Sequence, residues 1–109
     1  MLITVKPLSV NQAWQGRRFA TKEYKEYERF CLYLLPKAYL IPSDKIQLNL
    51  TFGLSNKSAD LDNCCKPWID ILQKKYNFDD KNIYKLIVEK KIVPKKQEYI
   101  EFSMEEFKE

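Results

Sequence analysis

The 109-residue sequence predicts an α+β domain in which two helices cover one face of a four-stranded mixed sheet. Apolar residues recur at helical spacing in two segments and alternate with polar residues in a third. β-branched and aromatic residues dominate two later segments. Together these patterns give the element order β-α-β-α-β-β. The length fits a single domain over residues 1–109 and leaves little room for a second.

The N-terminal half is predicted to contain a short strand, a loop and a helix. Residues 1–5 form the strand, which ends before Pro7. Residues 7–20 are rich in turn formers and predict an ordered loop. Thr21 is a good helix N-cap, and Pro36 ends the helix that follows. The apolar face of this helix is expected to be Tyr24, Tyr27, Phe30, Cys31, Leu34 and Leu35.

The C-terminal half is predicted to contain a strand, a second helix and a β-hairpin. Apolar and polar residues alternate in residues 45–52, as they do in a half-buried strand. The second helix is expected from about Asp62, with Pro67 in or near its first turn. Residues 82–93 and 98–104 are β-rich, and the polar stretch between them predicts a hairpin turn. The apolar face of the second helix is expected to be Cys65, Trp68, Ile69, Leu72 and Tyr76.

Composition restricts the chemistry that the chain can perform. The sequence contains no histidine, which excludes Ser-His-Asp and Cys-His catalysis and every His-ligated zinc or iron site. Its three cysteines form neither a disulfide framework nor a CxxC metal site. Its two glycines are too few for a glycine-rich phosphate loop. The reactive groups of an enzyme must therefore be carboxylates, amines, hydroxyls or a metal held by oxygen ligands.

The chain lacks the sequence features of secreted and membrane proteins. No apolar run approaches the ~20 residues that span a bilayer, and the N-terminus lacks the long apolar stretch of a signal peptide. We therefore expect a cytoplasmic protein with no membrane partner and no small-molecule cofactor. The net charge of +4 is modest for a nucleic-acid binder, so the distribution of charge is more informative than its sum.

Five of the six aspartates lie between residues 60 and 80 of an otherwise lysine-rich chain. Spacing alone leaves two interpretations of this acidic segment open. In the first, the carboxylates are helix caps, exposed ion pairs and turn residues, which are common on surface helices. In the second, Asp60 and Asp62 bind Mg²⁺ at a strand-to-helix junction together with a third carboxylate, and Lys66 faces a substrate phosphate.

The same segment resembles a known nuclease signature. It reads Asp60-Leu61-Asp62-Asn63-Cys64-Cys65-Lys66-Pro67-Trp68-Ile69-Asp70-Ile71-Leu72 and continues to Asp79-Asp80 and a β-rich strand. This is similar to the DxDNxxKxxxDxL signature, followed by DD, of the RusA family of Holliday junction resolvases, and every fixed position is present. The segment Pro7-Leu8-Ser9-Val10-Asn11 is also similar to the family's opening.

The resemblance implies a homodimeric, Mg²⁺-dependent crossover junction endodeoxyribonuclease that nicks four-way junction DNA symmetrically and is bacterial or phage-encoded. By motif position, Asp60, Asp62 and Asp80 correspond to the family's metal-binding carboxylates. Lys66 corresponds to its essential lysine, so all four residues are expected to be catalytic. The other expected site residues are a supporting shell of Asn63, Asp70 and Asp79 and DNA contacts at Asn11, Arg17, Arg18 and Lys57. For the loop of Arg17 and Arg18, a purely structural role, in which its aromatic residues anchor it to the core, stays open as well.

The position of Asp80 raises the question of which subunit it serves. A helix from residue 62 to residue 75 spans ~20 Å, and the five residues that lead to Asp80 recover at most ~17 Å. A cluster of Asp60, Asp62 and Asp80 within one subunit is therefore strained. Asp80 is alternatively expected to reach the other two aspartates across a dimer interface, and both arrangements stay open.

Two other functions are compatible with the same residues. One is a non-catalytic module that binds branched nucleic acid and keeps the acidic pattern for stability. The other is a small metal-binding enzyme that acts on nucleotides. Magnesium-dependent nicking of a synthetic junction would separate the nuclease from both.

Overall fold

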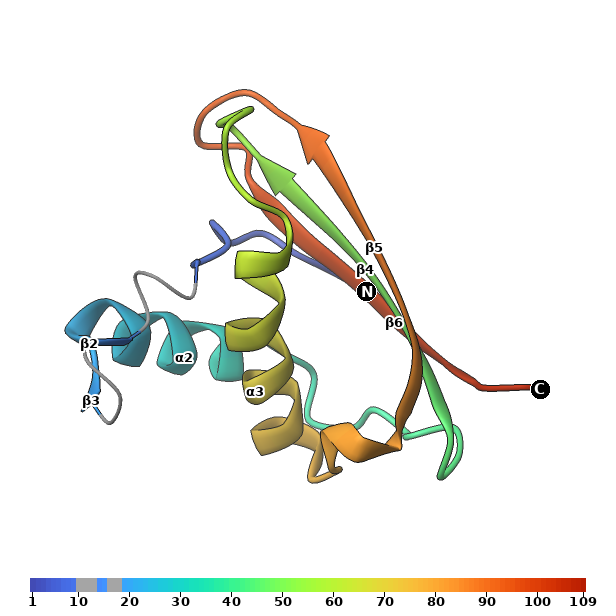
Figure 1. Cartoon of the computed structure of the whole chain (residues 1–109). Helices are drawn as coiled ribbons and strands as arrows, with labels where there is room; N and C mark the ends of the chain where they lie inside the picture. Colours follow the sequence, from blue (N-terminus) through green and yellow to red (C-terminus); the bar gives the residue numbers. More distant parts are fainter. Residues whose placement is uncertain (10–13, 16–18) are drawn as a thin grey trace.

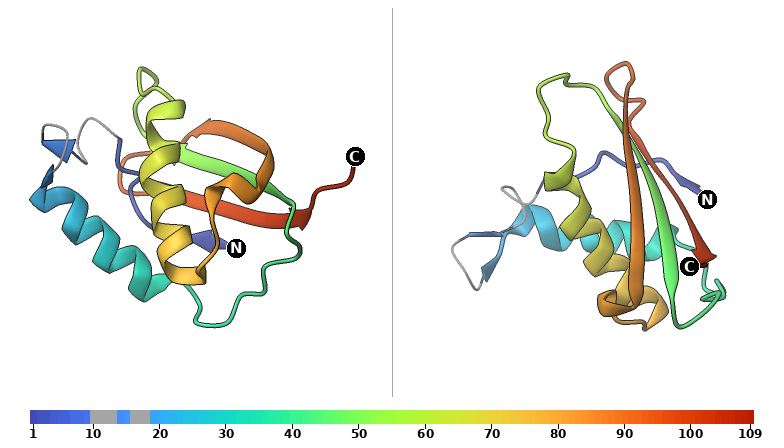
Figure 2. Two further views of the ribbon diagram at one scale, coloured as in Figure 1. Left: turned by 60° about the horizontal axis from the view of Figure 1, so that its bottom comes forward. Right: turned by 45° about the vertical axis from the view of Figure 1, so that its right-hand side comes forward.

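A computed structural model describes residues 1–9, 14–15 and 19–109 of the chain. In this part of the chain, two α-helices, α2 (Lys22–Leu34) and α3 (Cys65–Tyr76), lie on one face of a sheet (Figures 1 and 2). The predicted α+β architecture with a mixed four-stranded sheet is confirmed. The strands of this sheet are β1 (Leu2–Ile3), β4 (Ile46–Leu54), β5 (Ile83–Ile92) and β6 (Tyr99–Glu106).

The strands lie in the order β1-β6-β4-β5, with β4 parallel to β5 and antiparallel to β6. The hairpin predicted between residues 82–93 and 98–104 is therefore wrong, because β5 and β6 flank β4 on opposite sides. The chain between them crosses the end of β4, where the Val93 N–H donates to the Leu54 carbonyl at 2.9 Å. β4 is the most deeply buried strand, and its central place satisfies hydrogen bonds on both of its edges.

Residues 7–20, predicted as a loop, contain two short strands, β2 (Trp14–Gln15) and β3 (Phe19–Ala20). They pair as a separate antiparallel sheet. Strands of two residues are too short for the alternation of apolar and polar residues to reveal them. The loop prediction is therefore wrong at these four residues.

Both helices begin and end close to the predicted positions. Thr21 caps α2, since its side chain accepts a hydrogen bond from the Tyr24 N–H at 3.1 Å. A 3₁₀ turn, η1 (Asp62–Cys64), precedes α3, so Pro67 lies in the first turn of the helix, where no backbone donor is needed. Asn77 closes α3 in the left-handed conformation, with φ of 54°. No helix in the described ranges is both long and apolar enough to cross a membrane.

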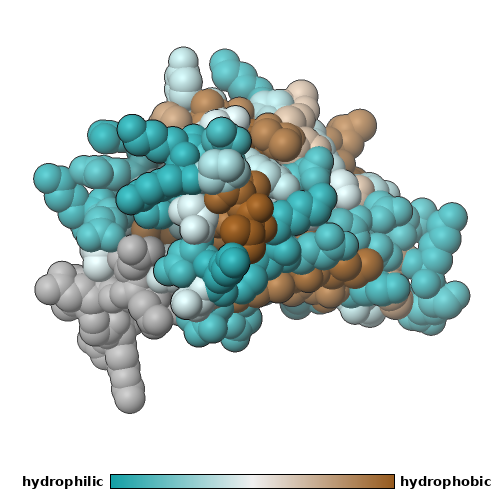
Figure 3. Space-filling view, turned by 90° about the horizontal axis from the view of Figure 1, so that it is seen from above, coloured by the Kyte–Doolittle hydropathy of each residue, from teal (hydrophilic) through white to brown (hydrophobic). Residues whose placement is uncertain are grey.

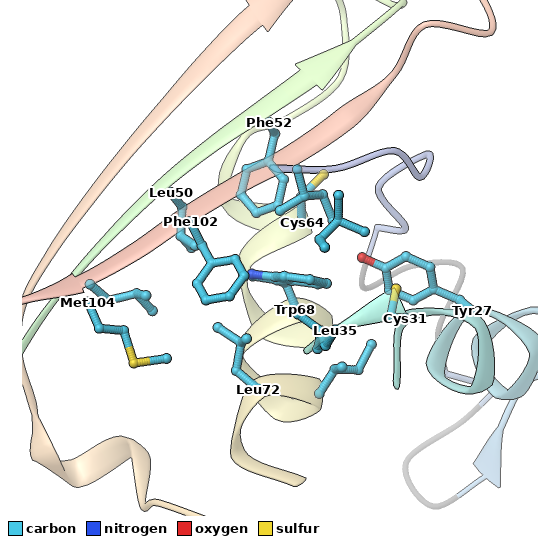
Figure 4. Packing of buried hydrophobic residues seen from close by; sticks show 14 of the residues in the cluster. Tyr27, Cys31, Leu35, Leu50, Phe52, Cys64, Trp68, Leu72, Phe102 and Met104 are labelled. Carbon is cyan, nitrogen blue, oxygen red and sulfur yellow. The ribbon is translucent and has the colours of Figure 1, made fainter. Parts of the chain in front are cut away.

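The core lies between the sheet and the two helices, and α3 contributes its largest side chain (Figure 4). Trp68 is fully buried and packs edge-on against Phe102, with ring centroids 5.8 Å apart. The buried face of α3 differs from the prediction, because Cys65 and Ile69 are only partly buried. The side of α3 that carries them faces the exposed edge strand β5. Trp68 and Leu72 are buried as predicted, Tyr76 is only partly buried, and Pro67 and Ile71 of α3 are buried in addition.

On α2, one expected core residue lies at the surface. Phe30 is 48% exposed, whereas Tyr24, Tyr27 and Cys31 are buried as predicted. Phe30 and Cys31 are adjacent in the helix, so their side chains point in different directions. Only one of the two can therefore face the core. The prediction for Phe30 is therefore wrong.

The three cysteines are unbonded and take part in packing. Burial raises the pKa of Cys31 to about 12 and that of Cys64 to about 11. Cys65 is half-buried, and its pKa is also raised by burial. All three side chains therefore remain neutral thiols and behave as small apolar groups.

Gly53 allows the ring of Tyr99 to pack across the sheet. The two residues are paired between β4 and β6, and a Cβ atom at position 53 would collide with the Tyr99 ring. We expect Gly53→Ala to lower the free energy of unfolding by about 1–3 kcal/mol, because the ring must move. Equilibrium unfolding in urea measures this loss. The loss should be smaller in a Tyr99→Ala background, and equal losses in both backgrounds would contradict the clash.

Candidate active site

Asp60 and Asp62 lie in the connection between β4 and α3. Both side chains are exposed, and Asp62 begins the 3₁₀ turn η1. They line the same groove of about 430 Å³, to which α3 contributes Cys65 and β5 contributes Leu86 and Val88. The structure therefore brings the two aspartates together at a strand-to-helix junction, as the sequence predicts.

Asn63 supports Asp60 through a local turn. Its Nδ2 lies at a long hydrogen-bond distance, 3.4 Å, from Oδ2 of Asp60, and its N–H donates to the Asp60 carbonyl at 3.3 Å. Asp60 and Asn63 also line a second cavity, of about 460 Å³. Asp60 therefore borders two hollows, and Asn63 contacts it, while a supporting role for Asn63 stays a prediction.

Lys66 is paired with Asp70 on the surface of α3. The Nζ of Lys66 donates to Oδ1 of Asp70 at 2.9 Å, and the two side chains are 60% and 19% exposed. This hydrogen bond is the main cause that raises the pKa of Lys66, and the charge of Asp80 adds to it. Lys66 therefore carries a permanent positive charge next to the acidic segment.

Gln73 connects Asp70 to the segment that contains Asp80, a role that the sequence did not reveal. Its Oε1 accepts a hydrogen bond from the Asp80 N–H at 2.8 Å, and its Nε2 lies 3.5 Å from Oδ1 of Asp70. The one available signal is its position three residues after Asp70 on the same helix. The contact with Asp80 depends on the path of the chain after α3.

Asp79 caps the N-terminus of the second 3₁₀ turn, η2 (Asp80–Asn82). Its Oδ1 accepts a hydrogen bond from the Lys81 N–H at 3.0 Å, which is the main cause that lowers the pKa of Asp79. Asp79 thus fixes the backbone turn that contains Asp80, and its supporting role in a catalytic site stays a prediction.

Asp80 lies apart from the pair Asp60 and Asp62. With Lys66 it lines another hollow, of about 310 Å³, between α3 and β5. Leu86 lines both this hollow and the groove of Asp60 and Asp62. Within the described ranges, no three Asp, Glu or Cys side chains lie close enough together to hold one metal ion. One chain therefore offers two of the three expected metal ligands at one place.

Of the four expected DNA contacts, Asn11, Arg17 and Arg18 lie outside the described residues. Lys57 is exposed in the loop that leads to Asp60. Its carbonyl accepts a hydrogen bond from Nζ of Lys90 at 3.1 Å, while its side chain is free to extend toward solvent. Lys57 is thus in a suitable place to contact a phosphate near the acidic pair.

Comparison with protein families identifies the chain as a DNA-cutting enzyme. The family model described as Endodeoxyribonuclease RusA matches residues 5–102. The chain belongs to the RusA endodeoxyribonuclease family, as its acidic motif indicates. Resolution of Holliday junctions by an endonuclease is the general function of this family, and branched DNA is its class of substrate. A comparison with curated proteins finds no matching relative.

Proposed function

We propose that the chain is a Mg²⁺-dependent endonuclease that resolves four-way DNA junctions as a homodimer, by paired symmetric nicks. The main support is the arrangement of Asp60 and Asp62, which share one groove about one helical turn before Lys66. Family membership supplies the substrate class. In this proposal Asp60, Asp62 and Asp80 are metal ligands, and Lys66 is the fourth catalytic residue.

The residues of the groove fit a magnesium ion. Mg²⁺ prefers hard oxygen ligands and commonly binds one or two carboxylates together with waters and a substrate phosphate. Asp60 and Asp62 offer two exposed carboxylates, whereas Cys65 in the same groove is only partly exposed. This donor set favours a hard cation over a thiolate-binding metal. When bound, Mg²⁺ would lower the pKa of a water molecule and stabilise negative charge on the phosphate.

Lys66 and a motif carboxylate would perform the remaining chemistry. The ammonium of Lys66 would contact the scissile phosphate and stabilise negative charge that develops on it. Its pairing with Asp70 orients the side chain and keeps it protonated at neutral pH. Because the chain contains no histidine, the attacking water would pass its proton to a carboxylate oxygen of the acidic motif.

Asp80 is proposed to act in the site of the second subunit. In one chain, Asp60 and Asp62 lie at one end of the surface between α3 and β5, and Asp80 lies at the other. Leu86 lines both ends. In a two-fold symmetric interface, the contacts between the two subunits are reciprocal. A two-fold axis near Leu86 would therefore place the Asp60 and Asp62 end of each subunit against the Asp80 end of the other. Each site would then combine Asp60 and Asp62 with the partner subunit's Asp80.

The exposed side chains of β5 support this arrangement. Tyr84 is 53% exposed and Leu86 is 43% exposed, and both lie on an edge strand. Figure 3 shows that apolar patches interrupt the hydrophilic surface of the molecule. Large apolar side chains on an exposed strand edge are typical of interaction surfaces. A second copy would cover them, and it would supply the second site that paired nicks require.

Removal of the metal is expected to abolish cleavage. With Mg²⁺, the protein should nick two opposed strands of a synthetic four-way junction and cut flap and duplex DNA much less. In EDTA no nicks should form, and Mg²⁺ in excess should restore them. Each strand is end-labelled in turn, and the products are separated on denaturing gels.

Two other results would contradict the proposal. A protein that binds branched DNA but remains inert with Mg²⁺ would favour the non-catalytic binding module. A protein that hydrolyses mononucleotides in preference to junctions would favour the small nucleotide-processing enzyme.

A further inference from the structure

Lys90 anchors the end of the loop that carries Asp60. The side chain extends from β5, and its Nζ donates hydrogen bonds to the carbonyls of Lys57 at 3.1 Å and Ala59 at 3.0 Å. Hydrogen bonds from a charged donor are stronger than those between neutral groups. Since Ala59 directly precedes Asp60, the peptide next to the proposed ligand is held from the neighbouring strand.

Glu98 anchors the start of the same loop from the other side of β4. Its Oε2 accepts a hydrogen bond from the Ser55 hydroxyl at 2.9 Å, and the residue is only 7% exposed. The pKa of Glu98 is lowered mainly by a hydrogen bond from its own backbone N–H, and the hydrogen bond from the Ser55 hydroxyl lowers it further. The carboxylate is thus ionised at neutral pH. It lines the same 460 Å³ cavity as Asp60.

Between these two anchors the loop closes on itself. The carbonyl of Asn56 accepts a hydrogen bond from the Ala59 N–H at 3.2 Å, and its Oδ1 accepts one from the Ser58 N–H at 2.9 Å. Asparagine commonly stabilises turns in this way. The segment from β4 to Asp60 is therefore a compact turn held from both sides, by Lys90 of β5 and by Glu98, which directly precedes β6.

We propose that Lys90 and Glu98 are positioning residues for the metal site, although neither belongs to the acidic motif. By fixing this turn, they hold the Asp60 carboxylate beside that of Asp62 before the metal binds. Groups that orient metal ligands without touching the metal commonly change its affinity by about 10–100-fold. The role rests on the proposed function, because that function makes Asp60 a metal ligand.

Lys90→Met tests the first anchor, and Lys91→Met is its matched control. Both lysines are exposed on β5, but adjacent strand residues point to opposite faces of the sheet. In titrations of the whole chain with Mn²⁺ alone, we expect Lys90→Met to raise the Kd by about 10–100-fold. Lys91→Met should leave the Kd unchanged. Lys90→Arg, which keeps a cation with several donors, should restore most of the affinity.

Hydrogen exchange of the metal-free protein provides a readout that does not depend on metal binding. Lys90→Met should speed exchange at the Ser58 and Ala59 amides by about tenfold and leave the amides of α3 unchanged. Unchanged exchange at these two amides would overturn the anchor. Faster exchange with unchanged Mn²⁺ affinity would show a purely structural role and overturn the positioning role. If the wild-type chain bound no Mn²⁺, the proposed function would fail, and exchange would still decide whether Lys90 holds the turn.

Glu98→Gln tests the second anchor, with Glu101→Gln as the control. Glutamine keeps the shape and one acceptor oxygen of Glu98 but loses its charge, so we expect a smaller rise in the Mn²⁺ Kd than for Lys90→Met. Glu101 lies on β6 and is exposed, and its substitution should leave the Kd unchanged. Equal Kd values for the two glutamine variants would overturn the role of Glu98.

Discussion

Asp62→Asn is expected to abolish cleavage of a four-way junction, while binding of the junction survives or becomes tighter. The substitution removes a negatively charged carboxylate, the proposed metal ligand, from the groove that Asp62 shares with Asp60. We expect a fall of about 10³-fold or more in the single-turnover rate, because charge stabilisation in the transition state is lost. Binding should survive, because a negative charge near the DNA phosphates is removed. Single-turnover cleavage and gel-shift titration in the same buffer measure the two effects.

Asp44→Asn is the matched control for this experiment. Asp44 is exposed, precedes β4 and is the one aspartate outside the acidic segment. We expect the cleavage rate of this variant to equal that of the wild-type chain within about twofold, as for most surface substitutions. Loss of junction binding in Asp62→Asn would indicate a structural role for Asp62 instead.

Mixed dimers of Asp62→Asn and Asp80→Asn subunits are expected to recover cleavage, although neither parent is active alone. If Asp80 acts in the site of the partner subunit, one site of the mixed dimer contains no substitution and the other contains both. Random pairing of equal amounts makes about half of the dimers mixed, so about one quarter of the wild-type number of sites should be intact. The rate of single-strand nicking after subunit mixing measures this fraction.

An arrangement within one subunit predicts the opposite outcome. Each subunit of the mixed dimer would then have a defective site, and mixing would recover nothing. A second mixture, of Asp60→Asn and Asp62→Asn subunits, is the control, because it leaves no intact site in either arrangement. Recovery in this control would show that the assay detects contaminating wild-type protein. The recovered products should be single nicks, since a mixed dimer has one intact site.

The sequence predicts the helices and most strands of this fold, but it does not predict the neighbours of each strand. Residues 45–52 alternate between apolar and polar side chains, which shows that one face is buried. The same pattern would suit an edge strand or a central strand. The actual order of the strands depends on the pairing of β5, which follows α3. It pairs parallel to one edge of β4, and β6 pairs antiparallel to the other edge. These pairings join distant segments, and short-range periodicity has no information about them.

The candidate site is likewise only partly predictable from the sequence. Asp60, Asp62, Lys66 and Asp70 are close in sequence, so the short connection and the helix that follows it keep them near one another. Other contacts join residues that are far apart in the chain. The Lys90–Ala59 hydrogen bond spans 31 positions, and the Glu98–Ser55 hydrogen bond spans 43. Such contacts follow from the sheet order, which the sequence did not reveal.

The packing of the cysteines has a practical consequence for experiments on this protein. Cys31 and Cys64 are buried, and burial keeps their thiols protonated, so alkylating reagents should react with them only when the core opens. The rate of labelling therefore reports how often that opening occurs. Denaturation exposes all of the thiols at once, and unfolded chains can then become crosslinked through disulfides. Mixing of two variant chains through an unfolded state consequently requires a reductant.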